Sequence, residues 1–460
     1  MNSSNQSMVG TEQSVLDFRE KLAFFIVNFG NIPIMTMMSS FLLLFYTDVV
    51  GLDPVAIGTL FLVSRIMDGL SDPIMGFIID HLPPTKLGRF RGYLILGAIL
   101  TGLNFLLVWM GPSLATSGKL VIAYISYLLI GWTFDLMDIP LNSMIPVMSD
   151  RERDRDTLST IKGAAYLLGS VAIIAGVLPL VSLFSTKQAG FHAVIIGVAG
   201  LMVLFSILGA LGIKERVFPA HEDTYHFTDI LHILAAKPVL ILFITTLLLN
   251  ISRSVTSAAL VYFFLYVLKR PDLFSLTTLS SVVGIIAAVI ATPLLVRRFG
   301  KKVCLALAAA LGLTGSLIQF FIPTSQPLLF VIVPLVVSPS IGLIMILFYG
   351  IQADNVDYIE WQLGYRAEAA VASMSSFILK AAGGVGGAIV AYLLAFFRYV
   401  PNAEMQSSET LQGLYYINFV IPSALFLAAL LIWAFFYPLT KEYTAKIMEE
   451  LTEQRKNAHV

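Results

Sequence analysis

The chain has 460 residues, of which 57% are hydrophobic and only 13% are charged, and its formal net charge at pH 7 is zero. Soluble domains carry about 25% charged residues, so this composition argues against a soluble protein and indicates side chains that face lipid or other helices. The zero net charge does not favour a nucleic-acid partner, and the single cysteine, Cys304, excludes an internal disulfide.

The first twenty residues are polar and do not resemble a cleavable signal, so the first apolar segment is expected to remain a membrane span. Twelve apolar segments have about the 20 residues that a spanning helix needs. We expect them at 22–46, 54–79, 91–112, 119–147, 160–183, 189–212, 238–268, 274–296, 303–322, 326–352, 368–397 and 413–437. These runs are continuous rather than alternating, which excludes a β-barrel and predicts an all-α membrane protein.

Lysine and arginine positions orient these spans. With the N-terminus in the cytoplasm, 20 of the 29 Lys and Arg residues fall in cytoplasmic segments, 5 in outer loops and the remaining 4 within spans. This excess follows the positive-inside rule, and it predicts cytoplasmic N- and C-termini in a multi-pass protein of the cell inner membrane.

The longest polar stretch between spans divides the chain into two halves of six spans. We expect an N-terminal bundle over 1–212, a cytoplasmic linker over 213–237, a C-terminal bundle over 238–440 and a cytoplasmic tail over 441–460. Each half has a short basic turn with a glycine after its second span, at 86–91 and 297–302. Two such bundles fit a major facilitator fold with a substrate site at mid-membrane between the halves. The alternative is two unrelated positive-inside loops.

Eight ionisable residues lie within the spans, where each costs about 2.5–3.5 kcal/mol on insertion scales. They are Arg65, Asp68, Asp72, Asp135, Asp138, Lys162, Arg253 and Lys380. Four acids therefore balance four bases. Because lipid does not tolerate isolated charges, the simplest interpretation is a shared polar cavity on an ion or substrate path.

The pair Asp68 and Asp72 is the most informative feature of the second span. The two residues are four apart, so on a helix they share one face with about 5–6 Å between their Cβ atoms. Two such close carboxylates in a low dielectric need a cation or a proton, and hard oxygen ligands suit Na⁺. Arg65 is a candidate for neutralising the pair when the cation leaves, and Ser71 and Asp135 are candidate further ligands. The alternative is a buried salt-bridge cluster that only locks helices together.

A second set of residues suits a sugar. Asp138 can accept hydrogen bonds from two sugar hydroxyls, which would reject ligands that lack them; its alternative role is to pair with Lys162 or Lys380. Asn31 and Asn142 add neutral donors and acceptors. Trp132 can stack on a sugar ring, although tryptophan is also an ordinary membrane-interface anchor.

Several strings, spread over both halves, resemble the glycoside–pentoside–hexuronide:cation symporters of the major facilitator superfamily. They are Phe45–Gly51, Gly58–Gly76 with its Arg-x-x-Asp-x-x-x-Asp-Pro pattern, Met137–Pro140, and Ala353–Trp361 followed by Arg366. The resemblance implies that Asp68 and Asp72 bind the coupling cation, that Asp138 and Lys162 hold the sugar, and that Lys380 links the two sites. It also implies a charged cytoplasmic gate made of Asp354, Asp357, Glu360 and Arg366.

Several positions depart from the family pattern. Asn28 and Asn31 lie where many members have an aspartate in the first span, Ser71 replaces an asparagine, and Asn142 stands where a sugar-stacking tryptophan is found. Asp135 replaces a threonine that helps to coordinate sodium, so a third carboxylate leaves both Na⁺ and H⁺ as coupling ions.

The sequence thus predicts a secondary active transporter that moves a sugar, glycoside or hexuronide with Na⁺ or H⁺ by alternating access, as a monomer and without a cofactor. The alternatives are symport of another amphiphile, such as a lysolipid, and a sugar sensor that does not transport. An enzyme is not expected, because an intramembrane aspartyl protease places its two acids on different helices, one of them in a Gly-x-Gly-Asp context that is absent here.

Overall fold

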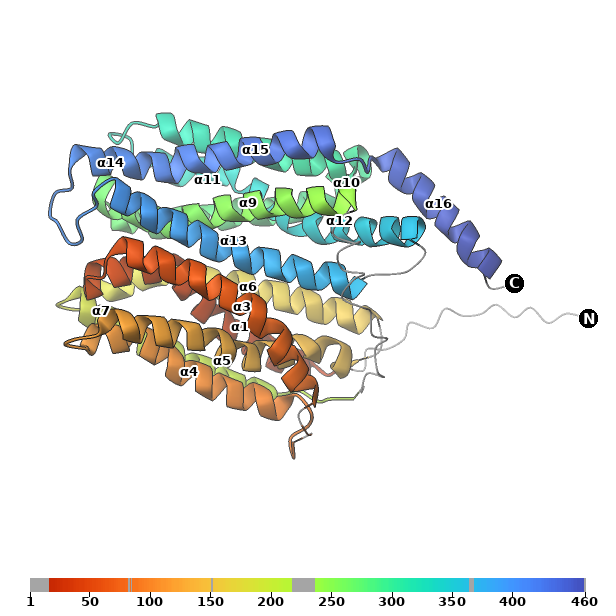
Figure 1. Ribbon diagram of the computed structural model, residues 1–460, viewed down its shortest axis with the longest axis horizontal. Helices are drawn as coiled ribbons and strands as arrows, with labels where there is room; N and C mark the ends of the chain where they lie inside the picture. The colour runs from red at the N-terminus through yellow and green to blue at the C-terminus, as the bar shows by residue number, and fades with distance from the viewer. Residues whose placement is uncertain are drawn as a thin grey trace, which may run out of the picture.

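The computed structural model describes residues 16–81, 83, 85–149, 152–216, 236–363 and 368–458, and Figure 1 shows them as a long bundle of helices. Within these ranges there is no strand, and the single antiparallel bridge joins Thr85 and Gly88. The predicted all-α class is therefore confirmed for the described residues. The linker segment 217–235 and its histidines lie outside them.

Helices α1 to α7 form one group, called here the N-terminal group (Figure 1). Its elements are α1 (Phe18–Ser40), α2 (Leu42–Leu44), the π-helix η1 (Phe45–Val50), α3 (Pro54–His81), α4 (Arg91–Leu114), α5 (Lys119–Met148), α6 (Glu152–Val181) and α7 (Lys187–Gly212). Helix α1 packs against α6 and α7, and α5 packs against α3 and α4. A capping box of Asp17 and Glu20 fixes the start of α1, because it satisfies backbone donors that the helix leaves free.

The remaining helices before the tail form the C-terminal group. They are α9 (Lys237–Tyr262), the π-helix η2 (Phe263–Val267), α10 (Pro271–Phe321), α11 (Leu329–Val337), α12 (Pro339–Leu363), α13 (Glu368–Phe396), α14 (Ser408–Tyr415), the π-helix η3 (Tyr416–Val420) and α15 (Ile421–Phe436). The tail helix α16 (Lys441–Ala458) follows. Helix α13 packs against α9 of its own group and against α3 of the N-terminal group.

The two ends of the bundle are easily told apart in Figure 1. The starts of α1 and α16 lie at one end, called here the terminus end. The turns that join η1 to α3, α4 to α5, η2 to α10 and α13 to α14 lie at the other, called the far end. Within α10 the chain reverses at Gly300, whose backbone (φ 79°, ψ 161°) is not helical. Glycine adopts this conformation without strain, so α10 consists of two antiparallel rods.

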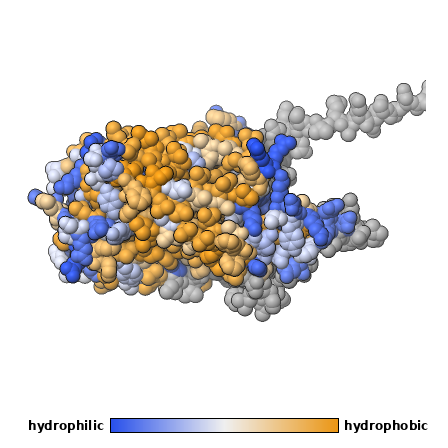
Figure 2. All heavy atoms as spheres, turned by 90° about the horizontal axis from the view of Figure 1, so that it is seen from above, coloured by the Kyte–Doolittle hydropathy of each residue, from blue (hydrophilic) through white to orange (hydrophobic). Residues whose placement is uncertain are grey.

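Apolar side chains cover the sides of the bundle, and polar side chains gather at both of its ends (Figure 2). Ten of the described helices are long and apolar enough to cross a membrane. Each apolar segment expected from the sequence lies mainly on helix, although the segment at 22–46 is interrupted at Phe41 and the segment at 326–352 at Ser338. Helices α6 and α12 also extend beyond their apolar segments into charged sequence at the terminus end, which hydropathy cannot detect.

The sequence predicts a cytoplasmic tail over 441–460, and in the structure one face of its helix α16 is buried. Ile447 and Leu451 pack into the core of the C-terminal group. The indole nitrogen of Trp361 donates a hydrogen bond to Glu450 Oε2 at 2.7 Å. Ile447 and Leu451 are four residues apart and share one face of α16, so the helix is amphipathic and docks against α12.

Candidate functional site

Helices α3 and α5 meet at an ion pair near the middle of the bundle. Arg65 Nη1 lies 2.8 Å from Asp68 Oδ2, and Arg65 Nη2 donates to the hydroxyl of Tyr127 at 3.5 Å. A Cβ atom at Gly131 of α5 would lie 2.8 Å from Asp68 Oδ1. The glycine thus lets the carboxylate approach the backbone of α5 closely.

A second ion pair joins the N-terminal and C-terminal groups. Lys380 Nζ of α13 lies 3.4 Å from Asp135 Oδ1 of α5, and the Asp135 side chain is buried whereas that of Lys380 is 36% exposed. Asp135 is one helical turn from Gly131, so Asp135 and the Asp68 carboxylate lie along the same face of α5. Asp68 of α3, Asp135 of α5 and Lys380 of α13 therefore lie close together.

Arg65 itself lies at the interface between the two groups. A Cβ atom at Gly384 of α13 would lie 2.0 Å from Arg65 Cγ, and Gly384 is one turn from Lys380. The two ion pairs are consequently stacked where α3, α5 and α13 meet. Small residues allow this close packing of helices.

Ser71 and Asp72 also lie on α3, but their side chains are outside the described part of the structure. The backbone is helical from Asp68 to Asp72, so the expected spacing of four residues on one helix holds. The contacts of these two side chains stay predictions.

Asp138 is the centre of a chain of polar contacts across α1, α5 and α6. Its Oδ1 accepts a hydrogen bond from Asn31 Nδ2 at 3.2 Å, and its Oδ2 accepts one from Asn142 Nδ2 at 2.7 Å. Lys162 Nζ donates in turn to Asn142 Oδ1. In this structure Asn142 therefore stands between Asp138 and Lys162. Asp138 is three residues from Asp135 on α5, so this chain adjoins the ion pairs.

Arg253 and Trp132 are less closely tied to the site. Arg253 is exposed near the middle of α9 and makes no hydrogen bond or ion pair with the residues that the structure describes. Ser257, one turn further along, contacts the hydroxyl of Ser40 on α1 at 3.0 Å. Residues four apart share a helix face, so Arg253 is on the side of α9 that faces the N-terminal group. Trp132 is half-buried beside Gly131.

Of the four expected gate residues, Asp354 has a clear partner in the structure. Lys301 Nζ lies 2.5 Å from Asp354 Oδ1 and donates to the carbonyl of Gly350 at 2.9 Å. This contact lies within the C-terminal group, and Lys301 belongs to the basic turn at 297–302. Asp357 and Glu360 are half-buried further along α12, and Arg366 lies outside the described residues.

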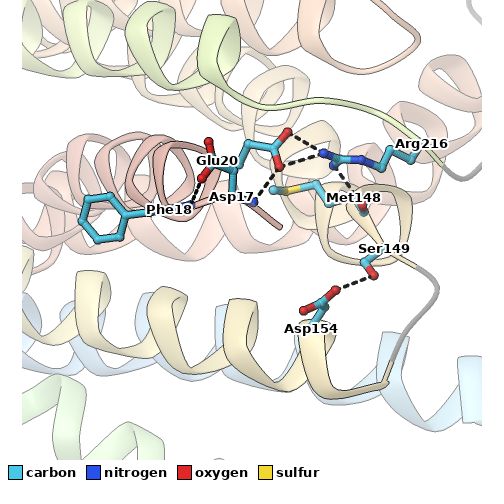
Figure 3. Close-up of polar contacts among 7 residues, drawn as sticks. All are labelled: Asp17, Phe18, Glu20, Met148, Ser149, Asp154 and Arg216. Atoms are coloured by element: carbon cyan, nitrogen blue, oxygen red, sulfur yellow. Dashed lines mark hydrogen bonds and ion pairs between the residues drawn. The ribbon is translucent and has the colours of Figure 1, made fainter. Parts of the chain in front are cut away.

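The terminus end of the N-terminal group has an ion pair that sequence reasoning missed. Arg216 Nη2 lies 2.7 and 2.8 Å from the two carboxylate oxygens of Glu20, and its Nη1 donates to the carbonyl of Met148 at 3.3 Å (Figure 3). Ser149 donates to Asp154 nearby. Glu20 also closes the capping box of α1, so this pair ties the ends of α1, α5 and α7 together.

A buried carboxylate at the far end was also missed. Asp48 of η1 accepts hydrogen bonds from Tyr399 on Oδ1 at 2.5 Å and from Tyr266 on Oδ2. Burial, together with nearby Tyr262 and Asp48, raises the pKa of the Tyr399 phenol above its usual value, so this hydroxyl stays protonated and can donate. Asp48 occurs in one of the resembling strings, but no charge of opposite sign in the sequence pointed to its partners.

The chain matches the family model described as MFS/sugar transport protein over residues 26–441. It is 30% identical to the isoprimeverose transporter of Lactiplantibacillus pentosus, over 87% of this chain and 85% of that one. It is 28% identical to the glucuronide carrier protein homolog of Escherichia coli (strain K12), over 91% and 92% of the two chains.

A crystal structure of a mutant of the nucleoside transporter NupG has a similar fold. Its TM-score is 0.66 at 14% identity, over 90% of this chain and 99% of that one. The matched family and relatives are membrane transporters and not enzymes. By sequence and fold together, this chain belongs to the MFS/sugar transport protein family and, as its resemblance implied, to the glycoside–pentoside–hexuronide type of transporter.

Proposed function

We propose that this protein is a secondary active transporter that takes up a sugar together with Na⁺ or H⁺ by alternating access. The observation that carries the proposal is the pair of stacked ion pairs, Arg65–Asp68 and Lys380–Asp135, at the middle of the bundle where the two groups meet. Ionisable residues at this depth are costly unless they serve an ion or substrate path.

The proposed topology has twelve spans, with both termini in the cytoplasm of a cell with an inner membrane. Ten helices meet the length and hydropathy needed for a span. The break at Gly300 divides one of these ten helices, α10, into two spans, which gives eleven. Helix α3, which carries intramembrane charges, supplies the twelfth. The excess of Lys and Arg in segments at the terminus end supports a cytoplasmic location for that end, so the far end faces outward. The chain divides into two bundles, 1–212 and 238–440, joined by the linker 213–237.

The coupling ion is proposed to bind among Asp68, Asp72 and Asp135, with Ser71 as a further oxygen ligand. Without the ion, Arg65 and Lys380 neutralise carboxylates that a low dielectric would otherwise penalise. A cation replaces this positive charge and frees Lys380, whose amine is partly exposed. Because binding of the ion and binding of the sugar then share one free energy, each must tighten the other by the same factor.

The sugar is proposed to bind at Asp138, Asn31, Asn142 and Lys162. Their side chains alternate acceptors and donors along a chain that leaves Asn142 exposed. Sugar hydroxyls can replace each of these contacts without leaving a polar group unpaired, which is the usual basis for rejecting ligands without hydroxyls.

Arg253 favours a sugar that carries an acid group. It is an exposed base on the face of α9 that points toward the N-terminal group, and it makes no ion pair among the described residues. A guanidinium binds a carboxylate through two parallel hydrogen bonds. One relative is a glucuronide carrier protein homolog, which supports the same class of substrate.

The test is to record Na⁺ and H⁺ fluxes into proteoliposomes while sugars are added, each acid beside its neutral counterpart, such as methyl glucuronide beside methyl glucoside. We expect one sugar class to drive one of the two ion fluxes. Binding without any flux would favour a sensor, and flux with neutral sugars only would remove the role given to Arg253.

A further inference from the structure

The far end contains polar contacts between the two groups that lie apart from the proposed ion and sugar sites. Asp48 of the N-terminal group contacts the C-terminal group through three acceptors. Its carboxylate accepts from the phenols of Tyr399 and Tyr266, one on each oxygen, and its backbone carbonyl accepts from Asn402 Nδ2. Asp48 thus accepts three hydrogen bonds from the C-terminal group at this end.

The partners of Asp48 form a rigid tyrosine cluster in the C-terminal group. The rings of Tyr262 and Tyr399 are perpendicular with centroids 5.3 Å apart, and those of Tyr266 and Tyr399 are 5.5 Å apart. Tyr262 also shares a hydrogen bond with Thr47 at 3.0 Å. Ring contacts thus hold Tyr262, Tyr266 and Tyr399 together where η1 brings Asp48 to them.

The charge of Asp48 suits a contact that opens and closes. Asp48 is 5% exposed, and within the described part of the chain no lysine or arginine forms an ion pair with it. Hydroxyl donors therefore hold its carboxylate in the closed form. When the groups separate, water replaces the phenols, so neither state leaves the carboxylate without hydrogen bonds.

The local backbone is also unusual on both sides of the contact. Asp48 lies in the π-helix η1 and Tyr266 in the π-helix η2, and such single π-turns are frequent at functional sites. Asn402 has a positive φ of 57°, a conformation that asparagine tolerates better than most residues. These deviations occur in the segment that carries Asp48 and in two segments that contact it, at Tyr266 and at Asn402.

We propose that Asp48, Tyr266 and Tyr399 form a latch that keeps the far end closed and must open once in every transport cycle. The assignment of this latch to the outer face of the membrane rests on the proposed function. The structure is then the state closed to the outside. Weakening the latch raises the population that is open at the far end without touching the ion or sugar site.

The test uses a single reporter cysteine. Replacing Cys304, the one native cysteine, with alanine and introducing Ser257→Cys places a thiol just inside the latch, at the contact with Ser40. Tyr399→Phe and Tyr266→Phe each delete one hydroxyl that donates to the carboxylate. We expect each to increase the rate of labelling by a membrane-impermeant maleimide from outside by about tenfold, since a hydrogen bond to a charged group changes an equilibrium by at least this factor.

The matched control is Tyr46→Phe. Tyr46 is buried beside Thr47, but its hydroxyl donates to the carbonyl of Val108 within the N-terminal group. This variant also loses one buried phenol hydrogen bond, and we expect its labelling rate to equal that of the parent. Labelling after denaturation in detergent reports the total inserted protein, so a variant that fails to fold is detected.

Equal labelling rates for Tyr399→Phe, Tyr266→Phe and Tyr46→Phe would overturn the latch. Labelling that rises only in inside-out vesicles would retain the latch and overturn the proposed orientation. Faster labelling from outside in a protein that moves no sugar with any ion would retain the latch and overturn the proposed transport function. Each result therefore separates this inference from the function on which it rests.

Discussion

Two buried acids form contacts across the interface between the groups, and the chemistry of their partners differs. Asp135, at mid-height, faces the amine of Lys380, whereas Asp48, at the far end, faces the phenols of Tyr266 and Tyr399. A base that neutralises an acid can be replaced by a cation, but a neutral hydroxyl can only be exchanged for water. The same residue type is therefore proposed to serve ion binding at mid-height and closure at the far end.

The largest effect is expected from removing charge at mid-height. Asp68→Asn and Asp72→Asn should each reduce ion-driven sugar accumulation by about 100-fold, since breaking a charged contact in a low dielectric costs about 3 kcal/mol or more. Uptake of labelled sugar into vesicles with an imposed Na⁺ or pH gradient measures this. The control is Asp272→Asn, which removes an exposed carboxylate paired with Arg270. Normal accumulation by both mid-height variants would refute the ion site.

The next largest effect distinguishes the sugar site from the ion site. Asp138→Ala removes the acceptor of both Asn31 and Asn142, so it should weaken sugar binding by about tenfold or more. Binding of the ion should change less, because Asp138 is absent from the proposed ion ligands. Calorimetric titration with each ligand checks both values. An equal loss for sugar and ion would show that the two sites are one.

A smaller effect is expected from packing at the interface. Gly384→Ala would place a Cβ atom 2.0 Å from Arg65 Cγ, and overpacking of this kind costs about 1–3 kcal/mol. The adjacent Gly383→Ala is the control, because its nearest contact would be an ordinary 3.9 Å to Ser254. The temperature of thermal unfolding and the transport rate should both fall for Gly384→Ala and stay near the parent values for Gly383→Ala. Equal behaviour of the two variants would show that Arg65 moves away readily.

The smallest effect on transport is expected at a contact within one group. Glu20→Gln weakens the buried pair with Arg216, which should lower the free energy of unfolding by about 1–3 kcal/mol. Transport per folded molecule should change by less than about twofold, since this pair does not cross the interface that moves. A large change in transport with unchanged stability would mean that the terminus end of α1 takes part in the cycle.

Much of the fold follows from hydropathy, because each expected apolar segment lies mainly on helix. The mid-span charges likewise identified Arg65, Asp68, Asp135 and Lys380, since lipid makes every such charge informative. The latch could not be predicted in this way. Tyr266 and Tyr399 are 218 and 351 residues from Asp48, and tyrosine is common in membrane proteins, so neither charge nor spacing indicated the contact.

Two further details of the site could not be predicted from the sequence. The side chain of Asn142 stands between Asp138 and Lys162, so the alternative role of Asp138, a direct pair with Lys162, is replaced here by contacts through an amide. The approach of Gly384 to Arg65 joins helices that are distant in the sequence. Both depend on how the helices rotate and cross, which the pattern of apolar residues leaves undetermined.

The most direct measurement is the affinity of the purified protein for a transported sugar with and without the coupling ion, for the parent and for Asp135→Asn. We predict that the ion raises the affinity of the parent for sugar, that sugar raises its affinity for the ion by the same factor, and that Asp135→Asn loses this linkage. Sugar binding by the parent that is indifferent to both Na⁺ and pH would contradict the exchange of a base for a cation at mid-height.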